Sequence, residues 1–171
     1  QVIAVVSGGN PLGINRTSDD GTLVELRQAG SIQGTIAVSG STVAYNGFSG
    51  RHEASGIADN VAVGTVVSTI DELDVHGETG EDRADHPKIE VSESVGDKRV
   101  YGFLAEYDEN FNKPMIASVG VGSVKVTGAC EGGDLLESNG DGTAKVQSDD
   151  IIKSKTIGKV TIGDSNTGVK L

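Results

Sequence analysis

The chain has 171 residues, a mass of 17.5 kDa and a formal net charge of −11. This length suits one ordinary domain with a smaller appended element. The acidic surplus argues against a nucleic-acid or anionic-membrane partner, because both require clustered Lys and Arg. With 36% hydrophobic residues, no Trp, three Tyr and three Phe, the core must be built from Val, Ile, Leu and Ala.

Glycine occurs 25 times and proline only three times, without the strict glycine period of collagen, so glycine here marks turns. Cys130 is the single cysteine, which excludes an intrachain disulfide and predicts a small buried core residue. No apolar run approaches the roughly 18 residues of a spanning helix. Residues 1–6 lack the basic flank of a signal peptide, and we expect no membrane insertion.

Apolar residues recur with a period of two in the first third of the chain, which predicts strands at 24–27, 32–38 and 42–45. Strands this short and this poor in aromatics cannot bury themselves. We therefore expect residues 1–48 to form a β-hairpin ribbon that packs against other copies of the chain. Its predicted intersubunit core consists of Val24, Leu26, Ile32, Ile36 and Val38.

Residues 49–171 are expected to form a second domain. Residues 61–68 predict a strand pair or a bent strand, with Gly64 at a bulge or a close backbone approach. From Asp71 to Asp85, seven acidic residues accompany a single arginine, Arg83, and little is apolar after Val75. This composition predicts an exposed loop.

The pattern of short strands resumes after Pro87. Asn139-Gly-Asp-Gly142 predicts a tight hairpin turn, because both dipeptides accept positive φ, and 148–155 is the one helical candidate. A turn at 95–98 is expected to join the strands at 88–92 and 99–105. The expected strands are 88–92, 99–105, 114–127, 133–137, 143–147 and 156–162. The whole predicts an all-β fold, with a barrel or sandwich of many short antiparallel strands after the ribbon.

Residues 14–36 resemble the hairpin near the C-terminal end of many bacteriophage tail fibre and tailspike proteins, with an Asn15-Arg-Thr17 start, an Asp20-Gly21 turn and a closing Gly34-Thr-Ile36. The remainder is similar to the β-domain that follows this hairpin in tail fibre-like virion proteins, on segments 45–52, 63–67, 124–128, 133–136 and 148–160. The resemblance implies a homotrimer with an intertwined or stacked ribbon and a terminal domain exposed on the virion.

The expected function is that of a structural virion protein that trimerises and attaches to a bacterial surface receptor, either a polysaccharide or a protein. Loops on a rigid β scaffold carry binding more often than strands do, so the acidic segment is the predicted contact surface, with 108–113 second. Other virion tail or capsid proteins are further expected partners. The predicted contact residues are Asp71, Glu72, Asp74, His76, Glu78, Glu81, Asp82, Asp85 and His86.

Two alternatives stay open. Some relatives of these fibre ends are intramolecular chaperones that cleave themselves, for which Ser49 or Ser55 near His52 and Glu53 would be the nucleophile candidates. The chain has none of the heptads that accompany such chaperones. A capsid-decorating or head-fibre protein would use the same trimeric architecture. We expect no enzyme activity, no catalytic residue and no cofactor.

A metal site is not expected. The acidic segment could supply Ca²⁺ with oxygen ligands, but its spacing fits no EF-hand. The Asn139–Gly142 segment resembles a fragment of calcium-binding β-roll repeats, yet it occurs once and lies between two strands. His52, His76 and His86 do not recur at ligand spacing and are interpreted as surface residues.

Overall fold

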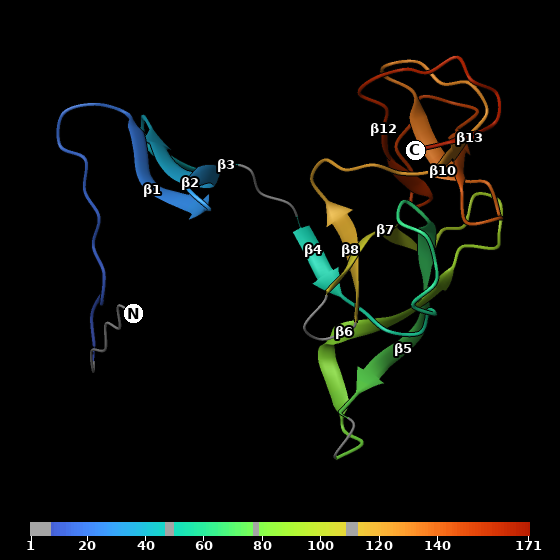
Figure 1. Ribbon diagram of the computed structural model, residues 1–171, viewed down its shortest axis with the longest axis horizontal. Coiled ribbons are helices and arrows are strands. Elements are labelled where there is room, and N and C mark those ends of the chain that lie inside the picture. The colour runs from blue at the N-terminus through green and yellow to red at the C-terminus, as the bar shows by residue number, and fades with distance from the viewer. Residues whose placement is uncertain (1–7, 47–49, 77–78, 109–112) are drawn as a thin grey trace. The chain divides into compact units, whose positions relative to one another are not determined.

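The computed structural model describes residues 8–46, 50–76, 79–108 and 113–171. The chain divides into two units, Gln1–Phe48 and Ser49–Leu171. The described residues form strands, turns and bends without a helix (Figure 1), which confirms the all-β prediction. Accordingly, no described segment is a helix of the length and apolarity needed to cross a membrane.

The first unit contains a three-stranded antiparallel meander in the order β1-β2-β3. Ala29 and Gly30, which join the first two strands, both have positive φ, at 48° and 84°. This is the backbone of a type I′ turn, whose twist matches that of the flanking strands. The strands are β1 (Gly21–Gln28), β2 (Ser31–Ser39) and β3 (Thr42–Asn46).

The second unit begins with a curled five-stranded antiparallel sheet in the order β4-β8-β7-β5-β6 (Figure 1). Because β5 lies between β6 and β7, these two strands are not the hairpin expected across the turn at 95–98. The strands are β4 (Gly50–Glu53), β5 (Val66–Val75), β6 (Asp82–Val91), β7 (Val100–Asp108) and β8 (Lys113–Val119).

A second sheet of shorter strands follows in the order β12-β10-β11-β9-β13. One of its pairs, β9 with β11, is parallel through Ala144 and Val126, so this sheet is mixed rather than wholly antiparallel. The strands are β9 (Val126–Thr127), β10 (Leu135–Ser138), β11 (Ala144–Val146), β12 (Thr156–Lys159) and β13 (Val169–Lys170).

The second unit has two apolar cores, and β5 contributes to both. Neighbouring side chains on a strand point to opposite faces, so Val66 enters one core and Val67 the other, and both are completely buried. Cys130 is buried in the Val66 core, as the sequence predicts. The first core contains Ala54, Val67, Ile89, Leu104 and Ile116, and the second contains Val66, Val126, Cys130, Leu136 and Ala144.

Gly64 lies at a close approach of three backbone segments, as predicted, but in a turn: β5 begins only at Val66, so the strand expected from residue 61 is wrong for 61–65. Its N–H donates to Leu104 O at 2.7 Å, and its carbonyl accepts from Lys125 N at 2.8 Å. Its φ is +85°, and an added Cβ would lie 2.3 Å from Leu171 Cδ1. Only glycine fits this position without a shift of its neighbours.

The turn at Asn139–Gly142 joins β10 to β11 in an antiparallel hairpin, which confirms that prediction. Asn139 N donates to Thr143 O at 2.8 Å. The Asp141 carboxylate accepts from the Thr143 backbone N–H at 3.0 Å and from its hydroxyl at 2.6 Å. Local side-chain bonds therefore hold the turn.

The helix expected at 148–155 is wrong, because side-chain hydrogen bonds replace helical ones. The buried Gln147 amide donates to Ile151 O and to Asp149 Oδ1, each at 2.8 Å, and accepts from the Thr156 hydroxyl at 2.8 Å. These bonds hold the backbone in a series of bends. The single strand expected at 114–127 is also wrong, since β8 ends at Val119 and no strand covers 120–125.

We expect Leu104→Ala to lower the free energy of unfolding by about 2 to 5 kcal/mol, because it opens a cavity at a fully buried site. Urea denaturation followed by circular dichroism measures the loss. Val119→Ala is the control, because Val119 is 61% exposed and its truncation should change the value by less than about 0.5 kcal/mol. Equal effects of the two variants would contradict the assigned core.

Candidate functional site

The acidic segment lies mostly on the β5–β6 hairpin rather than in the exposed loop that its composition predicts. Both strands extend to the tip, where His76 N donates to Glu81 O at 2.9 Å and Gly80 N donates to His76 O at 2.8 Å. Leu73 pairs with Pro87 and Val75 with Asp82. Backbone pairing continued from the buried half of β5 outweighs the low strand propensity of Asp and Glu.

A bulge interrupts this hairpin at Asp71. Thr69 pairs with Ile89 and Leu73 with Pro87, so β5 advances four residues between two pairs over which β6 advances only two. The additional residues are accommodated by Asp71, whose φ of 63° is left-handed. Asp tolerates this conformation better than most residues do. The bulge bends β5 and presents Asp71 to solvent.

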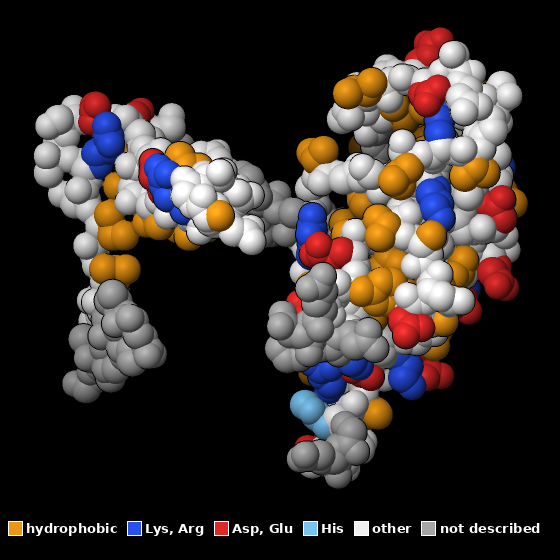
Figure 2. Space-filling model, in the orientation of Figure 1, with side chains coloured by type: hydrophobic (Ala, Val, Ile, Leu, Met, Phe, Trp, Pro, Cys, Tyr) orange, Lys and Arg blue, Asp and Glu red, His pale blue; other side chains and the backbone are white. Residues whose placement is uncertain are grey.

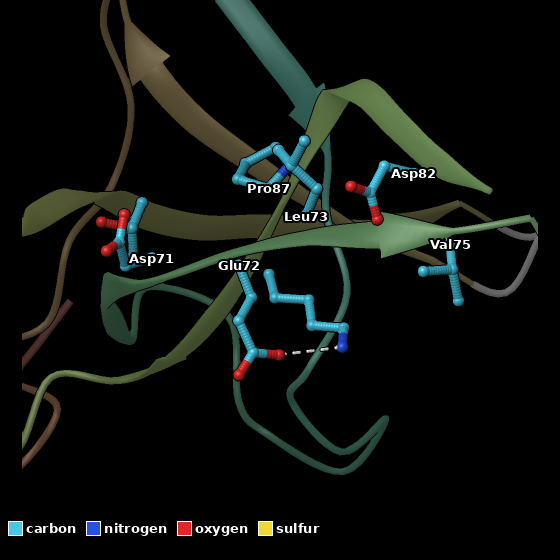
Figure 3. A pocket seen from close by; sticks show the side chains of 8 residues that line it. Asp71, Glu72, Leu73, Val75, Asp82 and Pro87 are labelled. Carbon is cyan, nitrogen blue, oxygen red and sulfur yellow. Dashed lines mark hydrogen bonds and ion pairs between the residues drawn. The ribbon is translucent and has the colours of Figure 1, made fainter. Parts of the chain in front are cut away.

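An open depression of about 640 Å³ lies beside the bulge (Figure 3). Its wall combines the carboxylates of Asp71, Glu72 and Asp82 with the apolar side chains of Leu73 and Val75. The rest of the lining consists of Thr69, Pro87 and Lys88. Glu72 Oε2 forms an ion pair with Lys88 Nζ at 3.0 Å. The lining therefore combines three carboxylates, one amine and several apolar side chains, and suits contact with a partner that carries donors or positive charge.

Asp74 faces away from Leu73 and Val75 because residues alternate along a strand. It is only 8% exposed and belongs to a network of charged side chains from four strands. Its Oδ2 pairs with Arg83 at 2.9 Å and Lys113 at 3.3 Å. Oδ1 accepts from the Ser55 hydroxyl at 3.0 Å. Asp74 thus stabilises the hairpin and is not part of an exposed contact surface, contrary to the prediction.

Arg83 is the centre of this network. Its Nη1 also pairs with Glu53 Oε1 at 2.7 Å, and its Nη2 donates to His86 Nε2 at 2.7 Å. His86 is half-buried, with Nε2 3.6 Å from Glu53 Oε2, rather than a surface histidine. The network connects β4, β5, β6 and β8, so the outer half of the hairpin is held to β4 and β8.

The pKa of Asp74 is lowered from 3.8 to about 2. Burial acts to raise it, but hydrogen bonds from Ser55, Arg83, Lys113 and the Val75 backbone favour the charged form more strongly. A group with a lowered native pKa stabilises the fold above its unfolded pKa and loses that effect as pH falls toward the native value.

The remaining predicted contact residues divide into two groups. Asp71, Glu72, His76, Glu81 and Asp82 are exposed on the hairpin. Glu78 and the side chain of Asp85 lie outside the described residues. In the second predicted segment, Asp108 ends β7 and Lys113 begins β8, with 109–112 outside the described part.

The serine candidates for self-cleavage are not joined to a histidine in the described part of the chain. Ser49 lies outside it, and Ser55 donates to the Asp74 carboxylate. The His52 ring is instead tilted against Tyr101, with centroids 6.4 Å apart. Among the described residues, no group of three or more His, Cys, Asp or Glu is arranged to hold a metal ion.

Sequence reasoning missed the cations of the network and their distant partner Glu53. The available signal was Arg83 itself, because a single arginine among seven carboxylates is expected to be paired. Lys113 could not be assigned in this way, since it is 39 residues from Asp74. Only the pairing of β7 with β8 brings it to the hairpin.

Comparison with protein-family models, with curated proteins and with solved structures finds no match to this chain. A functional assignment therefore depends on the residues and their geometry.

We expect Asp74→Asn to lower the free energy of unfolding at neutral pH by about 1 to 2 kcal/mol, because it removes the charge that Arg83 and Lys113 face. The parent should lose this contribution as pH falls from 3.8 to about 2, whereas the variant should show a flatter profile there. Urea denaturation at a series of pH values measures both effects.

Asp71→Asn is the matched control, because Asp71 is exposed and Asn also tolerates its left-handed backbone. The control should retain the parent's loss of stability in acid. The same flattening in both variants would show that the effect does not belong to the network.

Proposed function

We propose that this chain is a structural virion protein, the trimeric end of a phage tail fibre or related appendage that attaches to a bacterial surface. The proposal assigns assembly to the first unit and surface contact to the β5–β6 hairpin. The observation that carries it is the exposure of the first unit. None of its described residues, 8–46, is buried.

The register of the meander supports this assignment. Residues directly opposite each other in antiparallel strands share a face. Val24 lies opposite Ile36, which lies opposite Tyr45; Val38 lies opposite Val43, and Leu26 opposite Gly34. One face therefore carries Val24, Leu26, Ile36, Val38, Val43 and Tyr45. Ile32 follows the same alternation along β2, but a register shift places it opposite Arg27. Val43 and Tyr45 extend the predicted intersubunit core.

The residues that are aligned on the opposite face are polar or small, with Leu23 at the register shift between Thr22 and Val24. Thr22, Ala37 and Ala44 are aligned across the three strands, as are Glu25, Thr35 and Asn46. Asn46 Nδ2 donates to the Thr35 hydroxyl at 3.0 Å. The sheet is amphipathic, as expected of a sheet that buries one side.

The apolar face remains open to solvent, with Leu26 55%, Val43 53% and Tyr45 66% exposed. Hydrophobic side chains are visible at the surface of this unit (Figure 2). A three-stranded sheet of this size needs a covering surface for its apolar side. We infer that the cover is the same face of two further copies, which forms a stalk-like homotrimer.

The proposed attachment depends on the β5–β6 hairpin. Its tip and depression present exposed carboxylates on a backbone held by the Arg83 network, which suits contact with the polar groups of a receptor polysaccharide or protein. Three copies would bind together, so avidity strengthens a weak single site. The proposed protein acts by contact on the virion, with other tail or capsid proteins as partners and without catalysis or a cofactor.

The double substitution Leu26→Asp with Ile36→Asp should convert the trimer to a monomer while the second unit stays folded, because two charges would enter the apolar interface. Light scattering coupled to size exclusion measures the mass of the assembly. Thr22→Asp with Ala37→Asp, on the opposite face, is the control and should leave the trimer intact. A trimer that survives the apolar-face substitutions would overturn the assembly proposal.

Glu72→Ala with Asp82→Ala should reduce binding to host cells at least tenfold without changing trimer mass, because it removes two carboxylates from the depression. Fluorescent protein and cell sedimentation measure the apparent affinity. Deletion of the hairpin is unsuitable, since β5 and β6 also form the core. Glu106→Ala, which removes an exposed carboxylate on β7, is the control; equal binding by parent and hairpin variant would exclude this surface.

A further inference from the structure

Glu137 is a buried carboxylate flanked by two lysines. It lies on β10 and is only 5% exposed. Lys145 is directly opposite it on β11. On the other side, Glu137 pairs with Thr156 of β12, and Lys155 immediately precedes that residue. Two amines from neighbouring strands are thus directed at one carboxyl group.

The two lysines contact the carboxylate differently. Lys155 Nζ is in ion-pair contact with Oε2. Yet Oε2 is buried and accepts no hydrogen bond, so the geometry of this contact is not that of a hydrogen bond. Lys145 Nζ lies 3.8 Å from Oε1, beyond hydrogen-bond length.

The backbone of Gly96 closes over the Lys155 side. A Cβ at Gly96 would lie 3.3 Å from Lys155 Cδ, 3.4 Å from its Nζ and 3.6 Å from Glu137 Oε2. Gly96 N donates to Ser138 O at 2.8 Å, which fixes this backbone against β10. The Glu137 carboxyl group is therefore confined beside this backbone, whereas the Lys155 side chain keeps 27% of its surface exposed.

An ion pair with a buried carboxylate is a poor source of stability. Desolvation of two charges is offset only when geometry is good and the remaining lone pairs are satisfied. Here one carboxylate oxygen accepts no hydrogen bond. Conversion of the pair to a neutral product would remove the buried charge of Glu137 together with that of its partner.

We propose that Lys155 and Glu137 condense to an intramolecular amide. The ammonium first transfers one proton to the carboxylate, which leaves a neutral amine and a neutral acid. The Nζ lone pair then attacks Cδ, the N–C bond forms, and the C–O bond breaks. The hydroxyl leaves with a second proton from nitrogen as water, so no oxidant, reductant or other reactant is needed.

The proximity of the two groups favours this reaction. Groups held in contact react as if at a very high local concentration. Lys155 is the reacting amine because its Nζ lies against Oε2, whereas Lys145 Nζ is 3.8 Å from Oε1. The bond would join β10 to the start of β12 and enclose residues 137–155 in a covalent loop, whatever the assembly state of the protein.

Mass spectrometry tests the amide directly. The intact denatured chain should weigh less than its sequence mass by one water molecule. Trypsin cleaves after Lys and Arg, so digestion should yield a branched peptide in which 126–145, which contains Glu137, is joined to 154–159 through an uncleaved Lys155. An intact mass equal to the sequence mass, or two separate linear peptides, would overturn the proposal.

Lys155→Arg keeps the positive charge but removes the amine nucleophile, and this variant should show no water loss. Lys145→Arg is the matched control and should retain both the water loss and the branched peptide. A water loss confined to linear 126–145, as cyclisation at Asp141-Gly142 would produce, would also overturn the amide. Because the amide forms only in the folded protein, circular dichroism of each variant before denaturation checks that it has the parent's strand content.

Discussion

The second unit depends on the burial of both faces of β5. Val66 and Val67 are adjacent, point in opposite directions and are completely buried, one in each core. Backbone bonds from Val66 N to Gly142 O at 2.8 Å and from Ser92 N to Val66 O at 3.0 Å attach the strand to the turns around it. Ser68 continues the connection, since its hydroxyl donates to Ser92, which donates to Ser138 on β10. A strand with both faces and both edges covered cannot move without disrupting both sheets.

This constraint reaches the candidate contact surface because the outer half of the same strand carries it. Beyond the bulge at Asp71, β5 leaves the apolar core, and charge replaces packing as the source of stability. Asp74, Arg83, Glu53 and Lys113 connect the hairpin to the neighbouring strands. An acidic surface can therefore project from the domain and still have a defined shape, which is what attachment by contact requires.

The two units differ in how they use apolar residues. The second unit buries its Val, Ile and Leu in two cores, whereas the first displays an apolar face on an amphipathic sheet. This contrast underlies our proposal that the first unit assembles copies of the chain and the second carries the contact surface. The proposed Lys155–Glu137 amide would add covalent stability to the smaller sheet, whose strands of two to four residues offer few backbone bonds.

Local sequence determined the features that depend on neighbours in the chain. The all-β class, the turn at Asn139–Gly142, the close approach at Gly64 and the burial of Cys130 follow from periodicity, positive φ and side-chain size. Tertiary structure decided the features that depend on distant partners. Composition predicts a loop for the acidic segment, because it does not include the backbone pairing that continues outward from the buried half of β5. Composition also predicts that Asp74 is exposed, because Lys113 and Glu53 approach it only after β8 and β4 join the sheet. Charge in a sequence indicates where water is favoured, but the burial of a carboxylate depends on cations that the fold brings from elsewhere.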